Sequence, residues 1–212
     1  MLVGITGGPA CGKSAVTRLL RQRGAEVFSA DEAARAVLSI NGPVHAAIVE
    51  AFGSNILSKD GELNRAALGR LVFADAGARE RLNRITHPAI LRLLHAQLNA
   101  ALKDSSEGAI IAAEVPLLFE TDIADWFERI VVVAASEATQ IARLKARNGL
   151  NEAEARDLLK AQWPIQQKVL LADYVVWNEG SKEDLDAAVA RLWDQLKQYE
   201  PGSIRNRQAK RI

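Results

Sequence analysis

The sequence has too few cysteines and histidines for a fold built on disulfides or zinc. Its 212 residues include one cysteine, Cys11, and three histidines. A single cysteine excludes an internal disulfide, and these side chains form no zinc-ligand spacing. We therefore expect a protein of a reducing compartment. With 49% hydrophobic and 25% charged residues, the chain has the composition of a globular protein rather than a disordered or fibrous one.

An excess of one charge and long apolar runs are also missing. The 27 basic and 26 acidic residues give a net charge of +1, so no overall field attracts nucleic acid or an acidic membrane. No window holds ~18 uncharged apolar residues, and the N-terminus lacks the pattern of a secretory signal. We expect a cytoplasmic protein with no nucleic-acid, membrane or obligate protein partner. The basic residues near the C-terminus are interpreted as a solvated tail.

Short apolar, β-branched runs alternate with helical stretches along much of the chain. The runs predict strands at residues 2–6, 25–29, 109–115, 129–134 and 173–176. Such alternation predicts an α/β fold with a doubly wound parallel sheet. A helix at 13–23 links the first two predicted strands, which should therefore be parallel.

Two helical insertions interrupt this pattern. Residues 31–103 contain no convincing strand, and breaks are expected at Asn41-Gly42-Pro43, Lys59-Asp60-Gly61, Asp75-Ala76-Gly77 and His87-Pro88. Further helices are predicted at 136–148, 152–162 and 182–198, the last two beginning at capping residues Asn151 and Ser181. We predict a core of residues 1–30, 104–135 and 165–200, helical parts at 31–103 and 136–164, and a flexible tail at 201–212.

The segment from Gly7 to Ser14, here called the phosphate loop, has the spacing of a nucleotide-binding motif. Gly7, four residues, and then Gly12-Lys13-Ser14 lie between a predicted strand and a helix. Backbone N–H groups and the helix N-terminus would bind phosphates, Lys13 would bridge the β- and γ-phosphates, and Ser14 would ligate Mg²⁺. The predicted ATP-binding residues of this region are Gly8, Ala10, Cys11, Gly12, Lys13, Ser14 and Ala15.

Two alternatives concern this segment: the match to the nucleotide-binding motif could arise by coincidence, and Cys11 has two possible roles. The same four residues at this spacing occur by coincidence in roughly 1% of chains of this length, and the strand before and helix after lower that figure. Cys11 is either a reactive thiol at a helix N-terminus or a small residue that fills the loop.

Other residues narrow the chemistry. Asp31 directly follows the second predicted strand and is expected beside the phosphate loop, where it accepts a proton from a substrate hydroxyl, holds a metal-bound water or caps the next helix. Arg143 and Arg147 are four residues apart on one predicted helix, so both guanidinium groups can reach the same phosphates. The alternative is a solvated basic face with Lys145. No Asn-Lys-x-Asp guanine-reading motif occurs, which disfavours a GTP switch.

Over roughly residues 1–196 the chain resembles the dephospho-CoA kinase family. The shared features are residues 4–8, Ala30-Asp31, Ala34-Arg35, Phe52-Gly53, Ile56-Leu57, Asp60-Gly61, Leu63, Arg65, Leu82-Asn83, His87-Pro88, Pro116 to Glu120, Gln140, Arg143, Arg147, Ala172-Asp173, Asn178 and Gly180. Each feature alone is weak, but their order and spacing are specific to the family.

The resemblance implies transfer of the γ-phosphoryl group of ATP, with Mg²⁺, to the ribose 3′-hydroxyl of dephospho-CoA. It implies a nucleotide-binding core, a CoA-binding helical part at 31–103 and a lid at 136–164. Asp31 then corresponds to the base, Arg143 to a lid arginine, and Asn178 with Gly180 to the stretch near the adenine of ATP. Another small-molecule or nucleoside kinase, or less favourably a nucleotide-dependent switch, remains as an alternative.

Further candidates are assigned to the acceptor. They are Thr6, Arg35, His87, Pro116 and Leu117, with Arg35 either meeting a substrate phosphate or pairing with Asp31, and His87 either orienting substrate or supporting a bend. Pro116 and Leu117 follow a predicted strand end, where ligands of open sheets bind.

Glu114 and Glu120 are both candidate carboxylates near the metal, and the sequence does not choose between them. The chain departs from the usual family pattern at Ala10, Cys11, Ala15, Ser29 and Trp177, which makes ATP affinity the property most affected.

Overall fold

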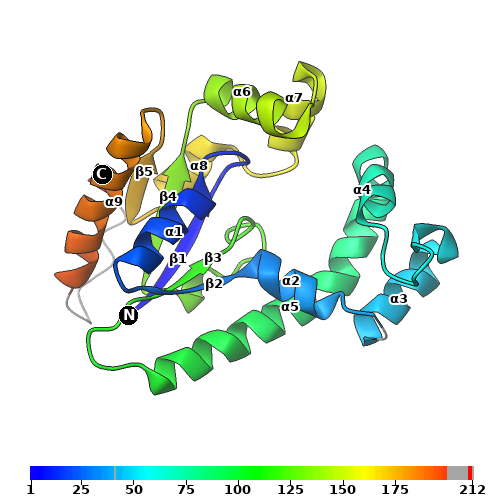
Figure 1. The fold of residues 1–212 in the computed structure, drawn as a ribbon, viewed down its shortest axis with the longest axis horizontal. Coiled ribbons are helices and arrows are strands. Elements are labelled where there is room, and N and C mark those ends of the chain that lie inside the picture. Colours follow the sequence, from blue (N-terminus) through cyan, green and yellow to red (C-terminus); the bar gives the residue numbers. More distant parts are fainter. Residues whose placement is uncertain (41, 200–209, 212) are drawn as a thin grey trace. The chain divides into compact units, whose positions relative to one another are not determined.

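The computed structural model describes residues 1–40, 42–199 and 210–211 (Figure 1). The chain divides into two compact units. The first comprises Met1–Phe28 and Ala100–Ile212, and the second comprises Ser29–Asn99.

The first unit is built on a sheet whose strands are joined by crossover connections. The strands are β1 (Leu2–Gly7), β2 (Glu26–Ser29), β3 (Ile111–Glu114), β4 (Arg129–Ala134), β5 (Tyr174–Trp177) and the two-residue β6 (Lys210–Arg211), in the order β2-β3-β1-β4-β5-β6. β1 pairs in parallel with both β3 and β4, and β5 pairs in parallel with β4. The predicted parallel α/β sheet is therefore confirmed.

The sheet order corrects one expectation about Asp31. Asp31 was expected beside the phosphate loop because it follows the second strand, but β3 lies between β2 and β1. Strand order depends on how the later strands pack, and no local pattern in the first thirty residues encodes it. The end of β3, rather than that of β2, is therefore adjacent to the strand that enters the phosphate loop.

Helices on the sheet explain why its strands are so apolar. Every residue of β1 and of β4 is buried, as expected for strands covered on both faces. Helices α1 (Lys13–Gln22) and α9 (Lys182–Lys197) pack against each other along the sheet (Figure 1). Val16 and Leu20 of α1 and Val189 and Leu192 of α9 are fully buried. A short helix, η2 (Ala124–Trp126), precedes β4.

Three helices connect β4 to β5. They are α6 (Glu137–Asn148), α7 (Glu152–Lys160) and α8 (Ile165–Leu170). Ile141 and Leu144 of α6 form a small core with Ala155 of α7. The predicted capping boxes at Asn151 and Ser181 are both present. The predicted helix 152–162 ends earlier, at Lys160, and α8, which begins directly after Pro164, was not expected.

The second unit is helical. It contains α2 (Ala30–Val37), α3 (Pro43–Phe52), η1 (Ser54–Ile56), α4 (Arg65–Ala74) and most of α5 (Ala76–Asp104). Ile48, Ile56 and Leu68 form the centre of its core. The expected break at His87-Pro88 is wrong, because α5 continues through Pro88. Proline removes one backbone hydrogen bond from a helix, and the length of α5 on both sides keeps the helix continuous.

Two expectations concern the chain end and membranes. Of the predicted tail at 201–212, all but Lys210 and Arg211 lie outside the described residues, and these two pair with β5 as β6. No helix in the described part of the chain is long and apolar enough to cross a membrane.

Candidate active site

The phosphate loop connects β1 to α1 with a backbone that requires glycine at two positions. Gly7 has φ 150° and Gly12 has φ 94°. A Cβ at Gly7 would lie 2.1 Å from the carbonyl oxygen of Val133, and one at Gly12 would lie 2.2 Å from Nδ2 of Asn178. Both distances are far shorter than a van der Waals contact, so Val133 and Asn178 pack directly against the loop backbone and leave no room for a side chain.

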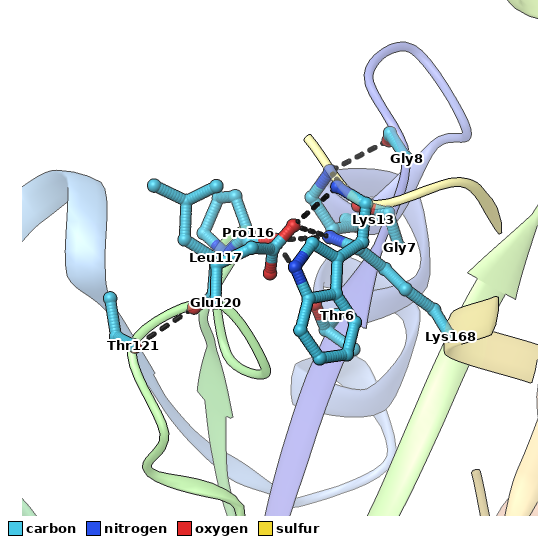
Figure 2. Close-up of polar contacts among 10 residues, drawn as sticks. Thr6, Gly7, Gly8, Lys13, Pro116, Leu117, Glu120, Thr121 and Lys168 are labelled. Carbon is cyan, nitrogen blue, oxygen red and sulfur yellow. Dashed lines mark hydrogen bonds and ion pairs between the residues drawn. The ribbon is translucent and has the colours of Figure 1, made fainter. Parts of the chain in front are cut away.

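The ammonium of Lys13 is turned toward the loop. Its Nζ donates to the carbonyl oxygens of Gly7 and Gly8, at 3.2 and 2.9 Å (Figure 2). Lys13 is also the first residue of α1, whose N-terminus carries a positive partial charge. The loop therefore combines a lysine ammonium and a helix N-terminus, the arrangement that binds a phosphate chain.

A buried carboxylate lies beside the candidate metal ligand. Ser14 Oγ and Thr17 Oγ1 donate to the two carboxylate oxygens of Glu114, each at 2.9 Å. Glu114 ends β3 and is only 8% exposed. Hydroxyl and carboxylate oxygens are the ligands that Mg²⁺ prefers, so Ser14 and Glu114 fit an ATP-associated magnesium ion. Of the two acids left open by the sequence, Glu114 contacts Ser14 and Glu120 contacts other groups.

Arg143 connects the helices after β4 to the phosphate loop. Its Nη1 donates to the carbonyl of Ala10 at 3.4 Å, and its Nη2 to the carbonyl of Asn178 at 3.0 Å. Asn178 in turn donates from Nδ2 to the carbonyl of Cys11 at 2.9 Å. Arg147 is exposed, and its Nε donates to the side chain of neighbouring Asn148. The structure thus brings Arg143 to the loop but not Arg147.

Cys11 is fully buried within the loop. Burial raises the pKa of its thiol, although the nearby ammonium of Lys13 acts in the opposite direction. A thiol with a raised pKa is largely protonated and weakly nucleophilic at neutral pH. Of the two alternatives, the geometry favours the small loop-filling residue.

The segment after β3 contacts β1 through the backbone of Pro116. The Pro116 carbonyl oxygen accepts hydrogen bonds from Thr6 Oγ1 at 3.1 Å and from Lys168 Nζ at 3.0 Å (Figure 2). Lys168 also forms an ion pair of 2.7 Å with Glu120. Leu117 is partly buried. The structure therefore joins Thr6 to Pro116, while the pocket-floor role predicted for Pro116 and Leu117 stays a prediction.

Lys168 was not among the site residues predicted from the sequence. Its ammonium is completely buried, yet no spacing pattern distinguished it from the other lysines of the chain. A fully buried lysine requires partners that compensate for its lost hydration. The only signal in the sequence was its position in an apolar stretch shortly before β5.

The remaining candidates lie in the second unit. Ser29 caps α2 by accepting from the N–H of Asp31, so the capping role considered for Asp31 belongs to Ser29. The exposed carboxylate of Asp31 accepts no hydrogen bond within the described ranges. Arg35 donates from Nε to the backbone oxygen of Asp31 at 3.2 Å and borders a hollow of about 150 Å³ with Glu62. Burial lowers the pKa of His87.

Comparisons with known proteins agree with one another. A sequence model described as Dephospho-CoA kinase matches residues 1–184. Among curated relatives, the Dephospho-CoA kinase of Geobacillus kaustophilus is 39% identical, over 92% of this chain and 98% of its own length. That of Geobacter metallireducens is 42% identical, over 95% of this chain and 99% of its own.

Solved structures give the same result for the fold. A crystal structure of TT1252 from Thermus thermophilus superposes with a TM-score of 0.75 and 32% identity, covering 92% of this chain and 97% of that one. The dephospho-CoA kinase of Campylobacter jejuni superposes with a TM-score of 0.68 and 26% identity, covering 92% and 96%.

Proposed function

The chain belongs to the dephospho-CoA kinase family, and on that premise we propose how its side chains divide the work of the reaction. The enzyme transfers the γ-phosphoryl group of ATP to the ribose 3′-hydroxyl of dephospho-CoA, the last step of coenzyme A synthesis. The observation that carries the assignment of residues is the phosphate loop with Lys13 and the Ser14 to Glu114 hydrogen bond.

The loop and the start of α1 hold the phosphates of ATP. Backbone N–H groups between Gly8 and Ser14, all except that of Pro9, which has none, surround the phosphate chain, and Lys13 exchanges the loop carbonyls for the β- and γ-phosphate oxygens. Ser14 and Glu114 would hold the magnesium ion that accompanies ATP, and the ion would supply positive charge that offsets the charge of the phosphates.

Arg143 acts on the migrating group. Phosphoryl transfer spreads negative charge over the equatorial oxygens, and a planar guanidinium close to them stabilises that charge. The bonds of Arg143 to Ala10 and Asn178 already aim its side chain at the loop. Asn178 holds the Cys11 carbonyl on the same side, which supports its assignment to the adenosine end of ATP.

In the second unit, Asp31 accepts the proton of the ribose 3′-hydroxyl. The proposal is supported by its exposed carboxylate in the first turn of α2, which is not used for capping. Arg35, four residues later, supplies a cation for the acceptor's phosphates. His87, whose pKa is lowered by burial, contributes a neutral imidazole to the same acceptor.

Turnover of Asp31→Asn with dephospho-CoA tests the assignment of the base. We expect kcat to fall by about 10²-fold, since a loose transition state needs only moderate help from a base. Glu32→Gln, which changes the next exposed carboxylate of the same helix, should retain the wild-type kcat. Wild-type turnover in Asp31→Asn would remove Asp31 from this role. A panel of nucleosides and other small alcohols distinguishes the alternative kinases.

A further inference from the structure

A large, exposed aromatic ring lies at the phosphate loop and has no role in the account above. Trp163, between α7 and α8, is 41% exposed. It borders a hollow of about 370 Å³ that is also lined by Gly8 and Pro9 of the loop. We propose that Trp163 stacks on the purine base of the acceptor nucleotide, an inference that rests on the proposed function.

The position of the ring is fixed by its neighbours. Trp163 stacks on Phe119, with ring centroids 6.3 Å apart and an interplanar angle of 10°. Phe119 itself is buried, at 8% exposure. The backbone N–H of Trp163 donates to Oε1 of Glu120 at 2.9 Å. Phe119 therefore supports one side of the indole, while the rest of the ring is exposed to solvent. A rigid aromatic ring of this kind stacks on bases at low entropic cost.

The carboxylate of Glu120, which accepts from Trp163, also has a buried partner of opposite charge. Glu120 Oε1 also pairs with the buried ammonium of Lys168, which bonds to the carbonyl of Pro116 (Figure 2). The same Pro116 carbonyl accepts from Thr6, one residue before the loop begins. Breaking a buried pair of this kind is costly, so its geometry is strongly maintained. This series of contacts fixes the position of the Trp163 backbone relative to Thr6 at the end of β1.

The order of the strands assigns this ring to the acceptor rather than to ATP. Glu120 follows β3, whereas Asn178 follows β5, and β1 with its loop lies between these strands. Asn178 and Arg143 bind the loop on the β5 side, where the adenosine of ATP is assigned. A base held by Trp163 therefore lies on the other side of the phosphates, where the acceptor must approach in line.

The size and charge of the hollow suit the adenosine end of dephospho-CoA. The attacking 3′-hydroxyl and the purine of the acceptor are attached to the same ribose. When the hydroxyl reaches a phosphoryl group at Gly8, the purine therefore lies within one ribose of the loop. A volume of about 370 Å³ is within the range of ligand sites. Arg156 and Lys160 line the same hollow and provide cations for the 5′-diphosphate. Arg156 already binds the carboxylates of Glu137 and Glu152, so it is placed to exchange one anion for another.

Steady-state kinetics of Trp163→Leu tests the inference. Loss of base stacking should raise KM for dephospho-CoA at least about fivefold and leave KM for ATP within about twofold. Trp163→Phe, which keeps an aromatic face, should show a smaller increase. Trp193→Phe in α9 is the control and should keep both constants. An increase confined to KM for ATP, or unchanged constants in Trp163→Leu, would overturn the proposal.

Fluorescence provides a readout that does not require turnover. Dephospho-CoA should quench tryptophan emission in the wild type and in Trp193→Phe, and most of that quenching should disappear in Trp163→Phe. Equal quenching in all three proteins would contradict stacking on Trp163. If the wild type does not phosphorylate dephospho-CoA at all, the proposed function has failed. If it does and the Trp163 variants behave like the wild type, only the stacking assignment has failed.

Discussion

The hydroxyl of Ser14 donates a 2.9 Å hydrogen bond to Oε1 of Glu114, which lies 100 residues later in the chain. Parallel pairing of β1 with β3 places Ile5 opposite Glu114 and so brings the carboxylate to the start of α1. Thr17 donates to the other carboxylate oxygen. The candidate metal site is therefore a product of strand register.

Glu114→Gln tests this relationship. The substitution keeps the size of the side chain but removes its charge and turns one acceptor into an amide donor that faces a hydroxyl. We expect kcat to fall by about 10²-fold and the Mg²⁺ concentration for half-maximal activity to rise. A Mg²⁺ titration of kcat measures both effects. Glu26→Gln, an exposed acid on β2, is the control, and an unchanged metal requirement in Glu114→Gln would contradict the assignment.

The two arginines of α6 should differ. Arg143→Ala removes the guanidinium that contacts the loop, and we expect kcat to fall by about 10²- to 10³-fold. Arg147→Ala should cost about tenfold or less, since Arg147 is exposed and bonds to Asn148. Lys145→Ala, also exposed on α6, serves as the control. Both kcat values are measured at saturating ATP. Equal losses of kcat in Arg143→Ala and Arg147→Ala would contradict the assignment of Arg143, rather than Arg147, to the migrating phosphoryl group.

A methyl group at Gly12 should damage the loop. With φ 94° and a Cβ 2.2 Å from Asn178 Nδ2, Gly12→Ala must displace Asn178 from the Cys11 carbonyl. We expect a loss of about 1–3 kcal/mol in the free energy of unfolding and a large increase in KM for ATP. Gly69→Ala is the matched control, because a Cβ at Gly69 in α4 meets no atom within 4 Å. Urea unfolding that shows equal stability for both variants would refute the packing argument.

His87 should make stability depend on pH. Burial lowers its pKa below the ordinary value of 6.5, so the unfolded chain takes up a proton at a higher pH than the folded protein. The free energy of unfolding should therefore decrease as pH falls through about 6.5 and level off below the folded pKa. His87→Gln should flatten this dependence between about pH 7.5 and 5.5. Parallel pH profiles for wild type and His87→Gln would contradict the predicted shift.

Local patterns in the sequence predicted much of this molecule. The strand at 129–134 appears with the same bounds, and the capping residues Asn151 and Ser181 begin α7 and α9. These features depend on neighbours a few residues apart, which the sequence displays directly. The phosphate loop is predictable for the same reason, because its glycines, lysine and serine all lie within the one short segment from Gly7 to Ser14.

Features that depend on tertiary packing were missed or misjudged. Two such features follow from strand order and register: the position of β3 between β1 and β2, and the contact of Ser14 with Glu114 rather than with Glu120. The continuity of α5 through Pro88 shows that a long helix tolerates one missing hydrogen bond. Lys168 and Trp163 carried no motif, since each makes its hydrogen bonds to a segment more than forty residues away in the chain.

The most direct test of the central claim is a coupled assay of ADP release by the purified protein with ATP, Mg²⁺ and dephospho-CoA. The account predicts ADP formation that requires dephospho-CoA, with one ribose 3′-phosphate formed per ADP as measured by phosphorus NMR. ATP consumption that is independent of dephospho-CoA, or phosphorylation of another small alcohol while dephospho-CoA remains unchanged, would contradict it.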